Sequence, residues 1–214
     1  MVAVIKGDII ASRKLVNQAI WLTPLKNLLA TWGSSPRDWK ITAGDYFQLE
    51  LANPEGALKK ALEIKALIKK VEPLEAQSKM STLDVRLAIG IGEKTYSGET
   101  IDESNGPAFH YSSDKFAELK KDHVTLSIKT PWEEFNEEMN LYLKLAGIFM
   151  DQWSVASAEI IQIVLQTPHI TQEEIGQQIG IKQNSVSGRW NRAHVKEILE
   201  IESMFRKKIK SLRT

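Results

Sequence analysis

The first 150 residues alternate between two spacings of apolar side chains, one typical of strands and one typical of helices. Strand-like runs lie at 2–5, 39–43, 46–51, 82–91 and 123–129, and helix-like stretches lie at 15–32, 54–71, 106–121 and 131–150. The order is therefore β-α-β-β-α-β-α-β-α, with a polar, glycine-containing loop at 93–105. It predicts an α+β fold in which helices cover one face of a mainly antiparallel sheet, a sandwich of ferredoxin-like type.

The rest of the chain shows helical spacing only. Segments with this spacing lie at 153–166, 172–179, 183–193 and 195–210. We therefore expect two domains, an α+β domain at 1–150 and an all-α domain at 151–214.

Residues 170–190 carry the pattern of a helix-turn-helix. Thr171 and Glu174 have the spacing of a capping box, which predicts the start of a helix. Gly180 suits the left-handed turn that ends this helix, and Val186 and Trp190 are the expected buried residues of the next one. The segment resembles the helix-turn-helix units of bacterial transcription regulators.

The second helix of this unit predicts contact with DNA. Its outward residues are expected to enter a major groove of DNA, where Gln, Asn and Arg can pair with base edges. These residues are Gln183, Asn184, Ser185, Ser187, Arg189 and Arg192. The alternative is a helical hairpin used for dimerisation or for contact with another protein. The net charge of +1, from 28 basic and 27 acidic residues, counts against DNA contact, because phosphate contacts normally dominate affinity for DNA.

Composition excludes several kinds of chemistry. The chain has no cysteine, so disulfides, thiolate metal sites and a cysteine nucleophile are excluded. No apolar run approaches the ~20 residues that span a bilayer, and the N-terminus does not read as a signal peptide. We expect a soluble, cytoplasmic protein without a membrane partner. A basic run at 206–213 fits a helix C-terminus, with phosphate contact as the alternative.

Two aspartates lie where the predicted fold would bring them to one edge of the sheet. Asp8 follows the first strand and Asp45 lies at a predicted Gly44-Asp45 hairpin tip. Such a pair can hold Mg²⁺ or Mn²⁺ together with substrate phosphates, and without a cation the two charges would repel each other. We expect 9–14 to open a helix whose free amides, with Ser12, Arg13 and Lys14, suit a triphosphate. The alternative is that Asp45 is an ordinary turn residue.

Four segments together resemble the SatD family. They read Gly-Asp-Ile-Ile-Ala-Ser-Arg at 7–13, Ala-Gly-Asp-Tyr-Phe-Gln at 43–48, Arg-Leu-Ala-Ile-Gly-Ile-Gly-Glu at 86–93 and Asn-Gly-Pro-Ala at 105–108. The family couples this N-terminal domain to a C-terminal helix-turn-helix, so the resemblance covers nearly the whole chain. The chain differs from members of that family at Tyr46, where Glu is usual, and at Ala88, where Gly is usual.

The same segments are more distantly similar to class III nucleotide cyclases and palm domains. That resemblance implies a metal site at Asp8, Asp45 and Ile9, and a nucleotide site that includes Ser12, Arg13, Lys14, Gly44, Arg86 and His110. His110 and Asp114 stand where cyclases carry the Asn and Arg that act on ribose and phosphate. Because Asp cannot neutralise a transferring phosphoryl group, cyclase chemistry in its usual form is not expected, and no catalytic residue is assigned.

The leading hypothesis is a DNA-binding regulator whose N-terminal domain binds a nucleoside triphosphate with Mg²⁺ or Mn²⁺. The alternatives are a metal-dependent nucleotidyl cyclase or nucleotidyltransferase that uses Asp8 and Asp45, and a non-catalytic protein-interaction module. A long apolar stripe from Phe135 to Trp153 further predicts a homodimer.

Overall fold

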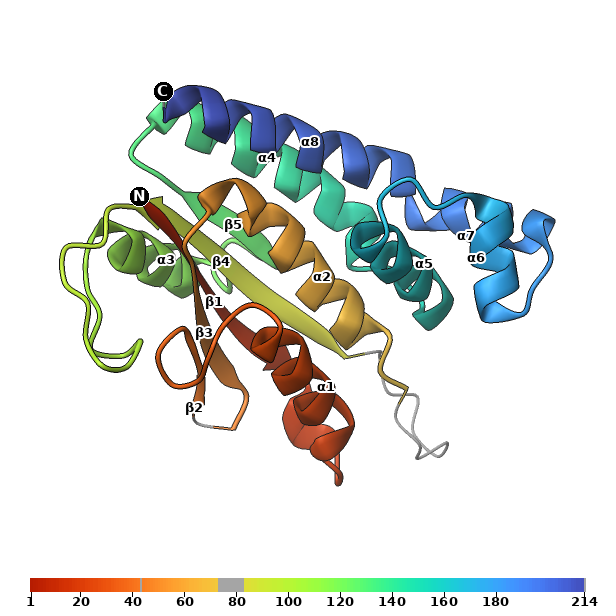
Figure 1. The fold of residues 1–214 in the computed structure, drawn as a ribbon, viewed down its shortest axis with the longest axis horizontal. Coiled ribbons are helices and arrows are strands. Elements are labelled where there is room, and N and C mark those ends of the chain that lie inside the picture. Colours follow the sequence, from red (N-terminus) through yellow and green to blue (C-terminus); the bar gives the residue numbers. More distant parts are fainter. Residues whose placement is uncertain (43, 73–82, 214) are drawn as a thin grey trace.

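A five-stranded mixed sheet with order β2-β3-β1-β4-β5 forms the centre of the molecule (Figure 1). This is a computed structural model, which describes residues 1–42, 44–72 and 83–213, apart from the side chain of Lys14. The strands are β1 (Val2–Ile10), β2 (Trp39–Thr42), β3 (Tyr46–Leu51), β4 (Asp84–Gly92) and β5 (Leu126–Lys129). Neighbouring strands are antiparallel except β4 and β5, which run parallel. Residues 43 and 82, which we expected in strands, lie outside the described part of the chain.

Helices separate the strands and make up the C-terminal part. They are α1 (Ala19–Ala30), α2 (Ala57–Lys69), α3 (Pro107–Glu118), α4 (Glu133–Met150), α5 (Val155–Gln166), α6 (Gln172–Ile179), α7 (Gln183–Ala193) and α8 (Val195–Leu212), with short 3-10 turns η1 (Ser12–Lys14) and η2 (Pro54–Gly56). The predicted order of strands and helices and the α+β class are confirmed. The 93–105 segment is a loop closed by one bridge between Tyr96 and Asn105.

Helices cover both faces of the sheet, so the expectation of one covered face is wrong. On β1, Ala3 and Ile5 join the main core, whereas Val4 packs with Ala108 and Phe109 of α3 in a separate cluster. Successive strand residues point to opposite faces, which places α3 on the face opposite α2. A Cβ atom on Gly90 would lie 2.4 Å from the backbone nitrogen of Ser112, so glycine in β4 permits this close approach.

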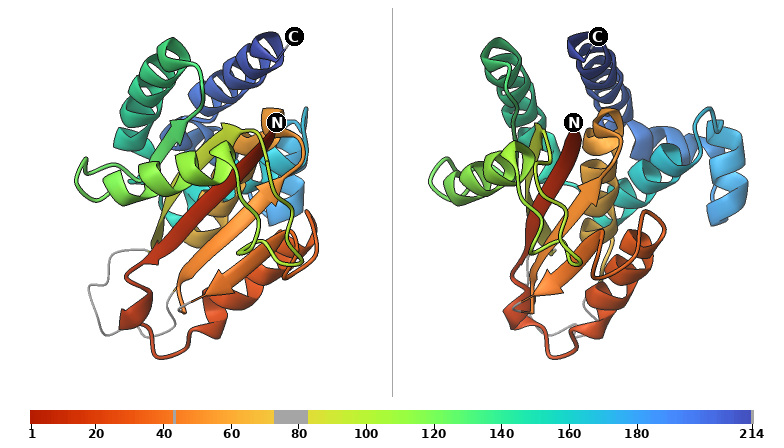
Figure 2. Two further views of the ribbon diagram at one scale, coloured as in Figure 1. Left: turned by 90° about the vertical axis from the view of Figure 1, so that its left-hand side faces the viewer. Right: turned by 60° about the vertical axis from the view of Figure 1, so that its left-hand side comes forward.

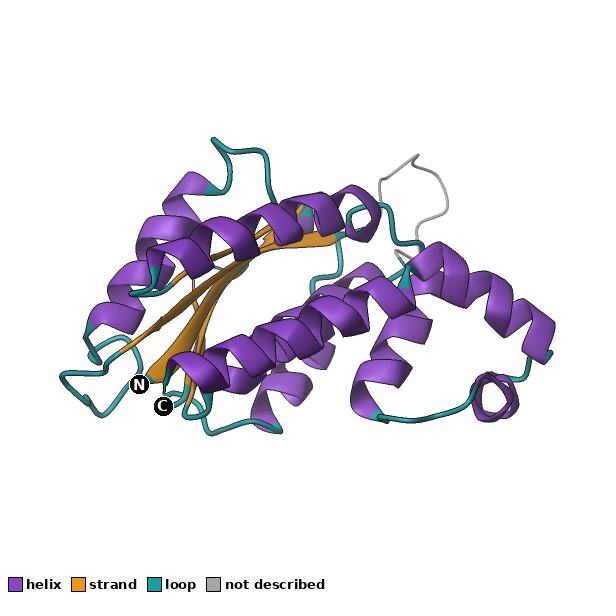
Figure 3. Ribbon diagram, turned by 90° about the horizontal axis from the view of Figure 1, so that it is seen from above, coloured by secondary structure: helices purple, strands orange, loops and turns teal. Residues whose placement is uncertain are grey.

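Helix α2 is enclosed between the sheet and the C-terminal helices. It contacts β4 and β1 on one side and α5 and α8 on the other (Figure 1). One continuous hydrophobic core therefore runs from Ala3 to Ile209 and joins the two predicted domains. Helices α6 and α7 lie at one end of the molecule, away from the sheet (Figure 3).

The outer edge of β5 is closed by side chains of α4 rather than by another strand. Asn140 accepts a hydrogen bond from the Ile128 N–H and donates one to the Ile128 carbonyl, both at 2.8 Å. Asn136, one turn earlier, makes the same pair of bonds with the backbone of Thr130, at 2.8 and 2.9 Å. Each amide thus substitutes for a peptide group of a missing strand and fixes α4 along the sheet edge.

A buried ion cluster joins α2, β4 and the end of α4. Lys65 is fully buried, and its Nζ atom lies 2.8 Å from Oδ1 of both Asp84 and Asp151. Its third partner is the hydroxyl of Thr125, at 3.1 Å. Lys69 donates to the Asp151 carbonyl oxygen at 2.6 Å and lies 3.4 Å from Asp84. Two cations thus face two carboxylates in this cluster.

We expect Lys65→Met to lower the free energy of unfolding by about 3–5 kcal/mol, because it leaves Asp84 and Asp151 without their shared cation. The measurement is urea unfolding at neutral pH. Lys26→Met is the control, since Lys26 is exposed on α1 and its replacement should change stability by less than about 0.5 kcal/mol. Similar small effects in both variants would contradict a structural role for the cluster.

Candidate functional site

Asp8 lies within β1 and forms an ion pair with Arg86 of β4. The register places Asp8 between Arg86 on one neighbouring strand and Tyr46 on the other. Arg86 Nε donates to Asp8 Oδ1 at 2.9 Å, and a terminal guanidinium nitrogen contacts Oδ2, so the pair is bidentate. The two side chains are only 18% and 19% exposed, which makes the pair less screened than one at the surface.

Asp45 lies in the tight turn between β2 and β3, as the sequence predicts. Gly44 has φ of +84°, a conformation that favours glycine. The Asp45 carboxylate accepts a hydrogen bond from the Ser12 hydroxyl at 2.9 Å and lies 3.9 Å from Arg13 Nε. The Asp45 carbonyl accepts a hydrogen bond from Ile9 N–H at 3.1 Å, so the turn is tied to the end of β1.

The backbone segments that carry the two aspartates thus lie side by side in space. Their carboxylates, however, have different partners. Arg86 supplies the positive charge that Asp8 was expected to take from a metal ion. Ser12 and Arg13 bind Asp45 instead. Within the described residues, no group of three or more His, Asp or Glu side chains is placed to hold a metal ion.

The helix that we expected to open at 9–14 is absent from that position. β1 continues to Ile10, a single 3-10 turn follows at η1, and α1 begins only at Ala19. A three-residue turn has no helix dipole to attract a triphosphate. Arg13 lies 3.9 Å from Asp45 with a side chain that is 91% exposed, whereas the side chain of Lys14 lies outside the described part.

His110 does not face the two aspartates. It is exposed on α3, and it lies two residues from Ser112, which packs against Gly90 of the sheet. Two residues correspond to about 200° around a helix, so His110 points away from the sheet. Asp114 of the same helix forms an ion pair with Lys129 at 3.0 Å.

A polar strip that the sequence reasoning missed lies beside Asp8 on the α3 face. Lys6 donates a hydrogen bond to Ser113 of α3, and burial lowers the pKa of its ammonium group. Tyr46 packs edge-on against Phe116, with ring centroids 5.4 Å apart, and burial raises the pKa of its hydroxyl to about 12. The sequence signal for this strip was the pair Lys6 and Asp8, which are two residues apart on β1 and therefore share a face of the sheet. If that face were covered only by apolar side chains, apolar residues would be expected at both positions.

The helix-turn-helix has the predicted local geometry. The Thr171 hydroxyl accepts from Glu174 N–H at 3.2 Å, and the Glu174 carboxylate accepts from Thr171 N–H at 2.8 Å, which confirms the capping box. Gly180 ends α6 with φ of +70°. A Cβ on Gly176 would lie 2.7 Å from the Ile181 carbonyl oxygen, so only glycine permits the turn to fold back here.

Helix α7 presents most of its predicted contact residues to solvent, but not Arg189. Arg189 forms an ion pair with Glu159 of α5 at 2.9 Å, so it fastens α7 to the helical core and is not directed outward. The exposed residues are Gln183, Asn184, Ser185, Asn191 and Arg192, and Ser187 is half-buried. Asn191 was missed, although it lies seven residues after Asn184 and thus on the same face. Val186 is fully buried and Trp190 half-buried.

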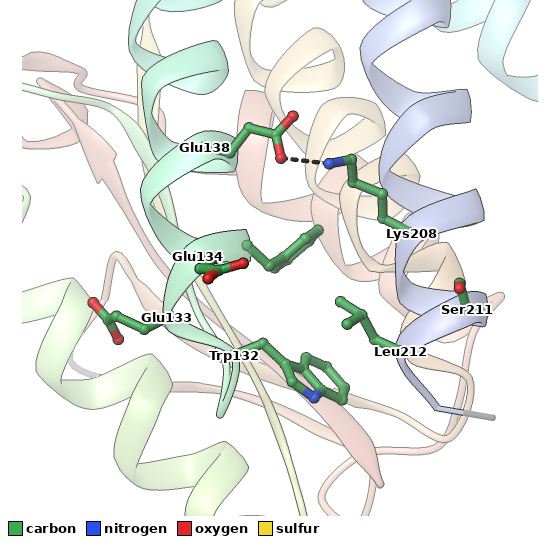
Figure 4. A pocket seen from close by; sticks show the side chains of 8 residues that line it. Trp132, Glu133, Glu134, Glu138, Lys208, Ser211 and Leu212 are labelled. Atoms are coloured by element: carbon green, nitrogen blue, oxygen red, sulfur yellow. Dashed lines mark hydrogen bonds and ion pairs between the residues drawn. The ribbon is translucent and has the colours of Figure 1, made fainter.

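The basic run at the end of the chain is largely engaged within the molecule. Arg206 pairs with Glu202 at 2.8 Å, Lys208 with Glu138, and Arg213 with Glu55. Figure 4 shows the Lys208 contact at one side of a hollow of about 420 Å³ between α4 and α8. None of the predicted site residues lines this hollow.

Comparison of the chain with protein-family models, with curated proteins and with solved structures finds no match. The resemblance to the SatD family therefore stays a prediction from the sequence. Among the described residues, none of the helices has the length and apolar character needed to cross a membrane.

We expect Asp8→Asn to lower the free energy of unfolding by about 1.5–3 kcal/mol, because the largely buried Arg86 loses a charged, bidentate partner. Asp114→Asn is the matched control: its carboxylate is 53% exposed, and an exposed pair contributes at most about 1 kcal/mol. Denaturant unfolding of the three proteins measures both effects. Equal losses would show that the Asp8–Arg86 pair is no stronger than a surface pair.

Proposed function

We propose that the protein binds DNA and that α7 enters the major groove. The observation that carries this proposal is the outward face of α7, on which amide side chains have no hydrogen-bond partner within the described part of the chain. Gln183, Asn184 and Asn191 are all exposed there. Asn and Gln can each make two hydrogen bonds to adenine in the major groove.

Charges beside α7 support contact with the DNA backbone. Lys182 precedes the helix and Arg192 lies near its end, and both are exposed. Neither forms an ion pair within the described residues, so both are available to phosphates. With few such contacts, we expect moderate affinity and a shallow dependence on salt concentration.

The test begins with selection of preferred sites from a random-sequence DNA pool by the wild-type protein. We expect Asn184→Ala to cost about 1–3 kcal/mol on the selected site and to relax the base preference at one position. Lys182→Ala should weaken binding to all sequences alike. Arg189→Ala is the control for folding: it removes the Glu159 contact but should leave the base preference unchanged. Failure of the wild type to enrich any sequence would contradict the proposal.

A second candidate function is the binding of a nucleoside triphosphate with Mg²⁺ or Mn²⁺ by the N-terminal part. The observation that favours it is topological. Within β1-α1-β2-β3-α2-β4 the strands have the order β4-β1-β3-β2, the order of a ferredoxin-like sandwich and of the palm domains that the sequence resembles. This order places Asp8 beside the turn that carries Asp45. We propose that a metal ion held there displaces Arg86, which would then be free to contact a phosphate.

We expect ATP or GTP with Mg²⁺ to raise the melting temperature of the wild type, because a ligand that binds only the folded state stabilises it. In Asp45→Asn the shift should disappear, while Asp114→Asn should keep it. Analysis of the nucleotide after incubation distinguishes binding from cyclase or transferase activity. A wild type with no shift would remove the nucleotide hypothesis. If DNA binding also failed, a protein-interaction module would be the remaining candidate.

A further inference from the structure

A second hollow, of about 400 Å³, lies between the end of α5, the middle of α8 and the first turn of α2. Helix α5 lies between α2 and the helix-turn-helix (Figure 2) and contacts both α2 and α7. This α5–α8 hollow has a volume at the lower end of the range for small-molecule sites. Its lining combines apolar side chains with charges of both signs, among them Val164, Leu165, Leu199, Lys59, Glu202 and Arg206.

Glu202 brings a buried carboxylate to the α5–α8 hollow. Its side chain is only 7% exposed, and its Oε2 atom accepts a hydrogen bond from Arg206 at 2.8 Å. No described residue donates a hydrogen bond to Oε1. Among the described side chains, no polar atom is both enclosed and without a partner, so Oε1 is accessible from the hollow that Glu202 lines. A largely buried carboxylate oxygen without a donor favours a ligand that supplies one, and an ammonium group supplies the strongest.

The end of α5 adds backbone acceptors at the same hollow. The carbonyl of Val164 lacks its helical donor, because the residue four positions later is Pro168, which has no N–H. No backbone N–H of the described residues bonds to the carbonyl of Leu165 either. Carbonyls in the last turn of a helix point past its end, where Pro168 and the hollow lie. The negative end of the helix dipole there also favours a cation.

Two cations line the α5–α8 hollow as well. Arg206 is 55% exposed and uses one nitrogen for Glu202, so within the described residues its other N–H groups are free for an acceptor. Lys59 lies 3.7 Å from Glu63, whose closer partner is Lys60 at 3.3 Å. The hollow therefore offers donors for an anionic group next to acceptors for a cationic one.

We propose that the α5–α8 hollow binds an α-amino acid with an apolar side chain. The ammonium group of the ligand donates to Glu202 and to the carbonyls at the end of α5, its carboxylate accepts from Arg206 and Lys59, and its side chain lies against the apolar residues of the lining. An α-amino acid carries its two charges on one carbon atom, and the paired Glu202 and Arg206 present opposite charges equally close together. An amine or a carboxylic acid would satisfy only one of them. The proposal does not depend on DNA or nucleotide binding.

Isothermal titration calorimetry with L-leucine and L-phenylalanine tests the proposal, and three analogues of leucine identify the groups that are recognised. Isoamylamine lacks the carboxylate, isocaproate lacks the ammonium group, and glycine lacks the apolar side chain. We expect leucine to bind at least about tenfold more tightly than each analogue, because each leaves a charged group or the apolar lining without its partner. A wild type that binds neither amino acid at millimolar concentration, or binds one analogue as tightly as leucine, would overturn the proposal.

Two substitutions test whether the amino acid binds in this hollow. Glu202→Gln removes the buried charge, and Lys59→Gln removes a cation while Glu63 keeps its closer partner Lys60. Each should weaken binding of leucine at least about fivefold. Lys207→Gln is the matched control, because it makes the same change at an exposed position of α8 that does not line the hollow, and it should bind as the wild type does.

Circular dichroism establishes that each variant is folded before its affinity is compared. Should Glu202→Gln fail to fold, Lys59→Gln alone decides the matter. Binding that is unchanged in Lys59→Gln, or that falls equally in Lys207→Gln, would place the ligand elsewhere and overturn the proposal.

Discussion

A fully buried ammonium group, that of Lys65, holds this fold together. A charged lysine is costly to bury unless carboxylates neutralise it, and here Asp84 and Asp151 do so. Because Asp84 begins β4 and Asp151 directly follows α4, the cluster joins the sheet, the central helix α2 and the start of the C-terminal helices. The cluster allows α2 to be covered on both sides, since Lys65 and Lys69 find their partners within the protein.

The position of α4 follows from this cluster at one end and from Asn136 and Asn140 along its length. The helix closes the edge of β5, which would otherwise present unpaired backbone groups to another chain. Its remaining face exposes Leu141, Leu145 and Ile148. Helices α5 and α8 pack on α2, and the helix-turn-helix lies at one end of the molecule (Figure 1). Gln183, Asn184 and Asn191 of α7 are exposed there. The same contacts thus determine the fold and leave the outward residues of α7 exposed.

Local patterns were enough to predict the elements, whereas long-range contacts were not predictable. Signals that span only a few residues predict the bounds of α6 and α7 and the capping box at Thr171. These predictions are confirmed. The burial of Lys65 on α2 could not be predicted from helical spacing, because nothing nearby in the sequence indicates partners 19 and 86 residues away. Arg189 was read as outward for the same reason, since Glu159 lies on another helix. The Asp8–Arg86 pair required the strand register, which no single segment contains.

The central claim is that the Lys65 cluster couples the C-terminal helices to the sheet. Native-state hydrogen exchange of the wild type and of Asp151→Asn tests it most directly. If the coupling is present, amides of β4 and α5 exchange with the same opening free energy in the wild type, and Asp151→Asn lowers both by the same amount. If α5 instead opens at a lower free energy than β4, and the substitution affects only one of the two, the coupling does not exist.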